Sequence, residues 1–532
     1  MKDSRRRFLA NAAKWLAFSA ATPGIAAAAA KQRTVSSGGR ARLALQRRVA
    51  AAKWELEREF PAHVTNGDEA AHDPAWVCYS KGLPHEASGA SAPDACRHLW
   101  KAVQTRDPRE FEDVPLGGYI KLANPQAAFA FDLCGPDSQQ IAVAPPPAFS
   151  SARQASEMVE LYWHALTRDV PFDRWEADPL IARAAEDLSR MQSFDGPRAG
   201  SAVTPKTLFR GITKGGLVGP YVSQFLWRDL PWTPIRVQQK IRIAAPEKDY
   251  LTSWQEWLNV QNGNVYPVND YEGTPRYIRT PRDLGEYVHR DFTYQAFLGA
   301  CLMLFRMNAP LDGGFRYQYS ISQSGFVTLG ASDILHVVAM VANIALKAAW
   351  FQKWAVHRRL RPEEYGARVH RHATGDGQYP LHRDLLDSPA LAMTNAKWNS
   401  YLLPQAYPEG SPLHPAFPSG HAVIAGACTT ALKACFAETF LIPNPQVPSE
   451  DGLTLKPYKG ELTVGNELDK LAENVSYGRN AAGIHWRTDA SEGLRLGEQI
   501  AINVLRETRM MSDEIVDAFT LTKFDGTRVE IR

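Results

Sequence analysis

Apolar residues recur at helical spacing through much of the chain, most clearly in its second half. Residues 285–307 and 331–353 predict two long apolar helices, and Ser332 or Asp333 is placed to cap the second. Residues 420–435 predict a third apolar helix, with no proline inside it. These patterns predict a mainly α fold.

The segments between the apolar stretches are irregular. Residues 362–413 are rich in Pro, Gly and His, and they predict a loop of the kind that often walls a functional site. Residues 453–465 and 518–531 predict two short β-hairpins. We therefore expect one helical domain over residues 31–532 with a few hairpins, and the chemistry described below places its catalytic part at about 285–510.

The composition is that of a globular protein, and the net charge does not indicate a particular binding partner. The chain has 532 residues, 45% hydrophobic and 22% charged, with a formal net charge of +3. This is an ordinary globular composition, and no motif or aromatic-interleaved basic stripe indicates nucleic-acid binding. The most apolar stretch, residues 334–351, contains His336, Asn343 and Lys347, so we expect no stable membrane insertion.

The first thirty residues predict an export signal. Residues 4–9 (SRRRFL) resemble a twin-arginine motif, followed by an apolar stretch at 15–21 and small residues at 26–30. The expected location is then the periplasm or outside the cell. The alternative is a basic N-terminal helix that belongs to the mature fold. In an oxidising compartment Cys78 and Cys96 could pair, because they flank a Gly/Pro/Ser-rich loop.

Three short stretches of the last third carry the candidate chemistry. They are residues 353–362 (KWAVHRRLRP), 414–421 (HPAFPSGH) and 479–489 (RNAAGIHWRTD). Lys353, Arg361 and Arg479 supply positive charges. Ser419 and Gly420 supply neutral donors, and His414, His421 and His485 supply titratable imidazoles. Arg donates to two oxygens at once and Lys adds a point charge, so this set suits a tetrahedral oxyanion.

Ser419 and Gly420 stand where the helix predicted for 420–435 begins, directly after Pro418. A helix N-terminus offers free N–H groups and a favourable dipole to an anion. His485 and Asp489 are four residues apart, so on a helix they share a face. The carboxylate could accept from one ring nitrogen and leave the other to bind a metal or attack phosphorus; the alternative, compatible with it, is that Asp489 caps a helix over 490–504.

The three stretches resemble the signature of the vanadium haloperoxidases and the related type-2 phosphatidic-acid-type phosphatases. That signature reads Lys-x(6 or 7)-Arg-Pro, then Pro-Ser-Gly-His, then Ser-Arg-x3-Gly-x-His-x3-Asp. Seven residues separate Lys353 from Arg361, which resembles the algal and cyanobacterial bromoperoxidases, and Gly478 stands where the pattern has Ser. Residues 81–85, 160–163, 209–211 and 219–226 are also similar to bromoperoxidase stretches.

This resemblance implies helix bundles with the anion site in the C-terminal bundle, and a vanadate cofactor. His485 would bind vanadium, and the vanadate oxygens would be held by Lys353, Arg361, Ser419, Gly420 and Arg479. Hydrogen peroxide would be activated there, with Lys353 donating to it and His421 as the acid–base residue. Halide and a small organic acceptor would be the other substrates, and the family often forms homo-oligomers.

The residues that line the halide side in the family correspond to His414 and Trp350. A His at the first position resembles bromoperoxidases, so we expect oxidation of bromide and iodide; core packing at a helix end is the alternative reading of Trp350. Two alternative functions would use the same set of oxyanion-binding residues. One is an exported acid phosphatase with His485 as nucleophile and His421 as proton donor. The other is a protein that binds oxyanions without turnover.

Overall fold

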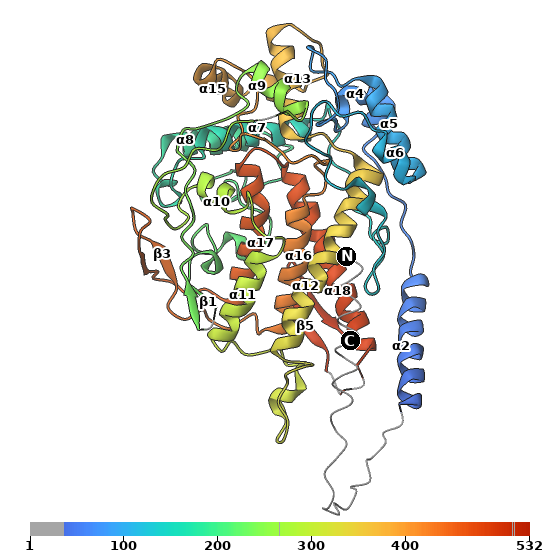
Figure 1. Ribbon diagram of the computed structural model, residues 1–532. Coiled ribbons are helices and arrows are strands. Elements are labelled where there is room, and N and C mark those ends of the chain that lie inside the picture. Colours follow the sequence, from blue (N-terminus) through green and yellow to red (C-terminus); the bar gives the residue numbers. More distant parts are fainter. Residues whose placement is uncertain (1–36, 233, 265, 513, 515–516) are drawn as a thin grey trace, which may run out of the picture. The chain divides into compact units, whose positions relative to one another are not determined.

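The computed structural model describes residues 37–532 except 233, 265, 513, 515 and 516. Its regular structure is mostly helical (Figure 1), as the sequence predicts. The contacts divide the chain between Val49 and Ala50, and every predicted site residue lies in the larger unit, Ala50–Arg532. The predicted signal, residues 1–30, lies outside the described residues.

Short helices separated by long irregular connections make up much of the first half. They are α2 (Gly38–Leu56), α3 (Asp68–Ala71), α4 (Pro74–Val77), α5 (Pro93–Thr105), α6 (Pro108–Glu112), α7 (Ala152–Thr167), α8 (Pro179–Arg190) and α9 (Trp254–Gln261). Helix α7 begins where the Ser151 hydroxyl accepts from the Gln154 amide. Glu157 and Glu160 on α7 are buried, and both pair with arginines from the last third of the chain.

The second half contains several short helices together with the two longest helices of the described residues. The helices of this half are α10 (Pro281–Tyr287), α11 (Gln295–Arg306), α12 (Ala331–Trp350), α13 (Pro362–Thr374), α14 (Arg383–Leu386), α15 (Pro389–Trp398), α16 (Gly420–Cys435), α17 (Val464–Ala481) and α18 (Arg487–Met510). Helix α16 packs against α18, α12 and α17 at the centre of this half (Figure 1). The predicted helix over 420–435 is therefore confirmed, and its apolar surface is core.

Helices α16 and α18 approach each other unusually closely because glycines face the opposing backbone. A Cβ on Gly426 would overlap the Leu494 carbonyl, and one on Gly497 would overlap the Val423 carbonyl. Ser419 stands at the start of α16, and His485 lies two residues before the start of α18. The close packing of these two helices therefore brings the second and third sequence motifs together.

Three antiparallel strand pairs accompany the helices. They are β1 (Leu230–Trp232) with β2 (Ile235–Val237), β3 (Gln446–Pro448) with β4 (Leu455–Pro457), and β5 (Phe519–Thr522) with β6 (Arg528–Ile531). The pair β5–β6 confirms the hairpin predicted for 518–531. The hairpin predicted within 453–465 was wrong, because β4 pairs with the preceding strand β3 and not with a later segment. The turn between β3 and β4 contains Asp451 and Gly452, and Gly452 has φ +71°.

The helix predicted for 285–307 is interrupted. Helix α10 ends at Tyr287 and α11 begins at Gln295. The polar side chains between them reach out of the helical path, with His289 bonded to Glu409 and Asp291 bonded to His421. The sequence did not predict this break, because the apolar residues on both sides keep helical spacing and only three consecutive polar residues, 289–291, separate them.

The next predicted helix, 331–353, is α12 followed by a π-helical turn, Phe351–His357, that carries Lys353. Its N-cap is Gly330 rather than Ser332 or Asp333, although the Asp333 carboxylate accepts from the Leu329 amide. Residues 362–413 were predicted as loop but contain α13, α14 and α15. Cys78 and Cys96 are buried free thiols, so the possible pairing between them does not occur.

One helical segment, Ala331–His357, is long and apolar enough to cross a membrane by length and composition alone. Half of its most apolar window is buried inside the protein. Its Val338, Val341 and Ala345 are fully buried in the main core, and the helix contacts α16 and α18. The apolar character of α12 is thus used in packing.

Candidate active site

The three sequence motifs converge on one cavity of about 230 Å³. Each comes from a different element: the turn after α12, the N-terminus of α16, and the junction of α17 with α18 (Figure 1). The cavity is lined by Asp291, Thr293, Leu346, Trp350, Pro412, His414, Gly420, His421, Ile424, Arg479 and His485. Lys353, Arg361 and Ser419 lie behind this lining, and all three are fully buried.

Lys353 and Arg361 are held by backbone carbonyls. The Lys353 amino group donates to the carbonyls of Pro415 and Ala416, at 2.7 Å each. Arg361 donates from Nε to the His414 carbonyl and from one terminal nitrogen to the Ile484 carbonyl, both at 2.9 Å. Burial lowers the pKa of Lys353 well below its ordinary value and lowers that of Arg361 to about 10.

Arg479 is the third predicted cation, near the end of α17. One terminal nitrogen donates to the Val288 carbonyl, and the guanidinium lies 5.9 Å from the centre of the Tyr407 ring. Its Nε is buried and has no hydrogen-bond partner among the described residues. Arg479 therefore keeps an unused donor where it borders the cavity.

The N-terminus of α16 supplies neutral donors. Ser419 is the N-cap, with its amide donating to the Asp489 carbonyl at 2.9 Å. Its hydroxyl is buried and unpartnered within the described part of the chain, and it makes no capping bond. Gly420 follows as the first helical residue and lines the cavity, where the free N–H groups of a helix start favour an anion.

These groups together fit an oxyanion. Across residues 37–532, with the five gaps named above, neither Lys353, Arg361 nor Arg479 pairs with a carboxylate. Buried cations without a counter-charge are costly, and buried donors without acceptors add to that cost. A tetrahedral anion in the cavity would satisfy the Ser419 hydroxyl and Arg479 Nε and favour the charged form of Lys353.

His485 presents one fixed nitrogen toward these cations. Its Nδ1 donates to Asp489 Oδ2 at 2.8 Å, and its Nε2 accepts from Arg361 at 3.0 Å. Burial lowers the pKa of His485 well below its ordinary value, and the charge of Arg361 lowers it further. The imidazole is therefore neutral with its lone pair on Nε2, which is the form that ligates a metal or attacks phosphorus.

Asp489 accepts from one ring nitrogen of His485, as the sequence suggested. The alternative that it caps a helix over 490–504 was wrong, because α18 begins at Arg487 with Trp486 as its N-cap and Asp489 is the third residue of the helix. Its Oδ2 accepts from His485 and also from the Trp486 amide at 3.1 Å, in the first turn of α18. The expectation that His485 and Asp489 share a helical face was wrong, because α18 begins at Arg487 and His485 lies in the turn before it. The hydrogen bond forms because that turn folds the ring back over the helix start.

A buried ionic network adjoins Asp489, and the sequence did not predict it. Arg359 donates to Asp489 Oδ1 at 2.8 Å and to Glu157 Oε2 of α7, also at 2.8 Å. It further donates to the Thr488 hydroxyl and the Gln154 side chain. Arg359 stands in the first motif two residues before Arg361, but nothing in its spacing distinguished it from a surface arginine.

His421 also has a partner that the sequence did not indicate. Its Nε2 lies 2.9 Å from Asp291 Oδ1, in the break between α10 and α11. Burial would raise the pKa of Asp291, but the interaction with His421 outweighs it and holds the pKa below its usual value. Asp291 is thus an anionic partner for a His421 that borders the cavity and is partly exposed.

His414 and Trp350 form the wall predicted for the halide side. Their ring centres are 4.7 Å apart, and both line the cavity. Arg361 donates to His414 Nδ1 at 2.9 Å, and burial followed by this charge lowers the pKa of His414 well below its ordinary value. Trp350 is anchored by Nε1, which donates to the Ala123 and Asn124 carbonyls. Its ring therefore serves the cavity wall rather than core packing alone.

The chain is similar to known proteins along nearly its whole length. A family model described as the VCPO second helical-bundle domain matches residues 334–514. A vanadium-dependent bromoperoxidase of Corallina officinalis is 34% identical over 92% of this chain and 98% of its own, and one of Ascophyllum nodosum is 36% identical over 91% of each.

A solved structure extends this similarity to the fold. The second vanadate-dependent bromoperoxidase of Ascophyllum nodosum, a homohexamer, superposes with a TM-score of 0.90 at 30% identity, covering 97% of this chain and 95% of its own. The three motifs, the helical architecture and the extent of these matches agree, and the chain belongs to the vanadium-dependent bromoperoxidase family.

Proposed function

We propose that the protein is a vanadate-dependent haloperoxidase that oxidises bromide and iodide with hydrogen peroxide to a hypohalous-acid-like halogenating species. The observation that carries this function is the buried cradle of Lys353, Arg361 and Arg479, which pairs with no carboxylate within the described part of the chain and lies beside His485 Nε2. Named bromoperoxidases of similar length support it. Small organic molecules would be the halogen acceptors.

The chain's own residues hold and orient the cofactor. His485 Nε2 would bind vanadium, and the oxygens would be held by Lys353, Arg361, Ser419, Gly420 and Arg479. Bound vanadate supplies a Lewis acid that makes hydrogen peroxide electrophilic toward halide. Lys353 would donate a hydrogen bond to the activated peroxide. Because burial lowers the pKa of Lys353, a bound anion is needed to favour the charged form of its amino group.

His421 is positioned to move protons at the open side of the cavity. Its Nε2 contacts the Asp291 carboxylate, which fixes the orientation of the ring. Hydrogen peroxide must lose protons as it binds and the hypohalous product must gain one, so a titratable imidazole fits this place. His414, against Trp350, would adjoin the halide.

A paired assay separates this function from phosphate hydrolysis. Protein stripped by a chelator is tested for bromination of a dione dye by hydrogen peroxide, with and without orthovanadate, and for aryl-phosphate hydrolysis without vanadate. We expect bromination only with vanadate. Phosphate hydrolysis without any bromination would mean that His485 serves as a nucleophile, an outcome that the named relatives do not favour.

Halide preference depends, in this proposal, on His414. The substitution His414→Phe keeps a planar ring against Trp350 but removes the nitrogen that meets Arg361. We expect a changed ratio of bromide to chloride oxidation at constant vanadate occupancy. An unchanged ratio would exclude His414 from halide selection.

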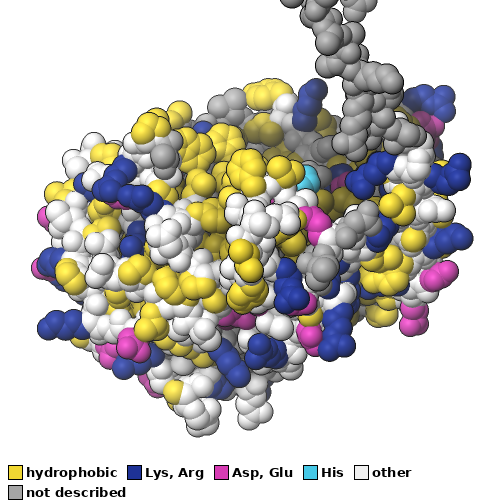
Figure 2. Space-filling view, turned by 90° about the horizontal axis from the view of Figure 1, so that it is seen from below, with side chains coloured by type: hydrophobic (Ala, Val, Ile, Leu, Met, Phe, Trp, Pro, Cys, Tyr) yellow, Lys and Arg dark blue, Asp and Glu magenta, His cyan; other side chains and the backbone are white. Residues whose placement is uncertain are grey.

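We infer that the protein forms a homo-oligomer. The solved bromoperoxidase that it resembles is homohexameric, and hydrophobic side chains gather on the face shown in Figure 2. Between α11 and α12, Ile321, Phe326 and Val327 are 105%, 67% and 74% exposed, which is unusual for such side chains. A second copy of the chain would cover them. Light scattering that gives the monomer mass at micromolar concentration would refute this inference.

We propose export by the twin-arginine route to the periplasm or beyond, on the strength of residues 4–9 alone. Replacing Arg5 and Arg6 together by Lys should retain the protein in the cytoplasm. Unchanged localisation of that variant in cell fractions would contradict the proposal.

A further inference from the structure

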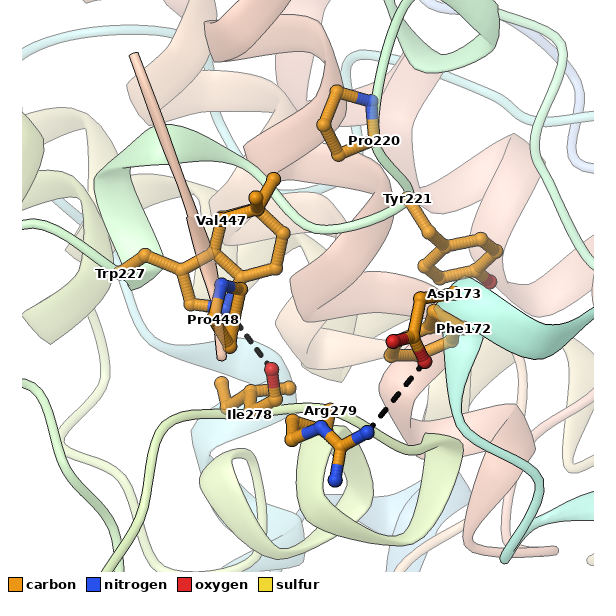
Figure 3. A pocket seen from close by; sticks show the side chains of 9 residues that line it. All are labelled: Phe172, Asp173, Pro220, Tyr221, Trp227, Ile278, Arg279, Val447 and Pro448. Carbon is orange, nitrogen blue, oxygen red and sulfur yellow. Dashed lines mark hydrogen bonds and ion pairs between the residues drawn. The ribbon is translucent and has the colours of Figure 1, made fainter. Parts of the chain in front are cut away.

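A second cavity, of about 230 Å³, lies away from the oxyanion site and shares no lining residue with it. Figure 3 shows Trp227 on one side, next to Val447, and Tyr221 on the other. The Tyr221 ring is stacked on Phe172 with centres 4.4 Å apart and planes 8° from parallel. The cavity is thus a slot between two aromatic walls.

Both walls are fixed before any ligand arrives. Trp227 is 4% exposed, and its Nε1 donates to the Ile278 carbonyl at 3.0 Å. The Tyr221 hydroxyl donates to the Phe209 carbonyl at 2.7 Å. The polar atoms of both side chains are already bonded. Phe172 covers one face of the Tyr221 ring and the Arg210 guanidinium lies 5.0 Å from the ring centre, so the apolar surface of this wall is shared by Tyr221 and Phe172. Such aromatic surfaces bind planar rings by stacking or edge contact.

Arg279 supplies the charged end of the slot. Its side chain is 13% exposed, and its one ion-pair partner among the described residues is Asp173, with an N–O distance of 3.6 Å. Asp173 is 61% exposed, so this pair is long, solvated and weak. In Figure 3 the guanidinium lies below the two walls, and a dashed line joins it to Asp173. The remaining donors of Arg279 match a carboxylate, which accepts two parallel bonds from arginine.

We propose that this slot binds a small aromatic carboxylate, with the ring between Trp227 and Tyr221 and the carboxylate on Arg279. The volume limits the ligand to one substituted ring, because pockets for drug-sized ligands measure about 300–1,000 Å³. The charge of Arg279 selects an acid over a neutral ring of the same size. This site is independent of the oxyanion cradle and of its chemistry.

Calorimetric titration of the whole protein, without vanadate, halide or peroxide, tests the site with benzoate and with neutral benzyl alcohol as probes. Benzoate should saturate one site per chain. Arg279→Gln should weaken benzoate binding about tenfold or more, since a hydrogen bond to a charged group is lost. Asp173→Asn removes the competing carboxylate and should tighten benzoate binding.

Arg109→Gln is the matched control, because Arg109 is an exposed arginine paired with an aspartate on α6, and it should leave benzoate binding unchanged. Unfolding midpoints equal to wild type show that each variant is folded. Three results would overturn the proposal: no saturable benzoate binding, equal weakening of benzoate and benzyl alcohol in Arg279→Gln, or displacement of benzoate by orthovanadate. The last result would place the probe in the oxyanion site.

Discussion

Arg359 and His485 lie on opposite sides of the Asp489 carboxylate and bond to different oxygens of it. Burial raises the pKa of Asp489, and the charge of Arg359 opposes that rise. A charged Asp489 keeps the proton of His485 on Nδ1 and therefore keeps Nε2 free for vanadium. Arg359 touches neither cofactor nor substrate, so we regard it as a positioning residue.

Replacing Arg359 by Gln should lower the affinity for vanadate about 10–100-fold, the usual effect of losing a partner behind a metal ligand. Without the guanidinium, Asp489 and Glu157 would lose the one arginine that bonds to both of them, and both would protonate more readily. Equilibrium dialysis of vanadate measures the effect, and Arg359→Lys should recover part of it.

Arg358→Gln is the control for Arg359→Gln. Arg358 is its neighbour in the chain but forms a partly exposed pair with Glu69, outside the cavity. Vanadate affinity should be unchanged in this variant. A loss of equal size in both variants would show that the effect comes from general destabilisation and not from Asp489.

At the scale of elements, His289 joins the end of α10 to the loop before α16. Its two nitrogens lie 3.2 Å from Glu286 and 2.7 Å from Glu409, and its ring stacks on Tyr407 at 3.7 Å. Burial would lower the pKa of His289, but the two carboxylates outweigh it and raise the pKa above 6.5. The pKa of Glu409 is held below its ordinary value, since His289 outweighs the effect of burial.

The stabilisation from His289 should therefore be full below about pH 6.5 and should be lost as pH rises through its raised folded-state pKa. The contribution of Glu409 has the opposite sign, being present above its unfolded pKa of 4.5 and lost as pH falls through its lowered pKa. The pair stabilises the fold most between these limits.

Denaturant unfolding of wild type and His289→Gln should show this dependence. We expect a difference in free energy of unfolding of about 1.5–3 kcal/mol at about pH 6, the size of a hydrogen bond to a charged group, narrowing toward about pH 9. His98→Gln, which changes an exposed histidine, should have little effect at either pH. A difference that does not vary with pH would contradict the assigned charge on His289.

The sequence predicted elements well where one physical signal dominated. Residues 420–435 form one helix because their apolar positions are core on every side, and the hairpin at 518–531 follows from its Asp525–Gly526 turn. The break at Asp291 and the π-helical turn at Lys353 depend on bonds to distant residues. No local pattern records such bonds, so Asp291, Arg359 and Glu157 were missed, although their neighbours His421 and Asp489 had been singled out.

In the larger unit as a whole, residues from the first half of the chain stabilise the segments that carry the site. Lys81 forms a fully buried ion pair of 3.0 Å with Glu363 of α13. Its amino group also donates to the carbonyls of Glu409 and Ser411, at 2.6 Å each. These bonds tie residues far apart in sequence to the loop that leads to His414. The catalytic third therefore depends on the first half for its shape.

Lys81→Met should lower the free energy of unfolding by about 3–5 kcal/mol, because Glu363 would keep a buried charge without its cation. Adding Glu363→Gln should restore part of the loss. Lys101→Met removes an exposed pair with Glu110 and should cost no more than about 1 kcal/mol. Equal costs for the two lysines, measured by denaturant unfolding, would show that the buried pair does not join the halves.

The most direct measurement of the central claim is a titration of metal-free protein with orthovanadate, with bromide oxidation followed at each addition. In wild type, activity should rise from zero and saturate at one vanadate per chain. His485→Ala should remain inactive throughout, while His382→Ala, which changes a half-buried histidine outside the cavity lining, should match wild type. Full activity without vanadate, or saturable activation of His485→Ala, would contradict the assignment of His485 and its cationic cradle as the cofactor site.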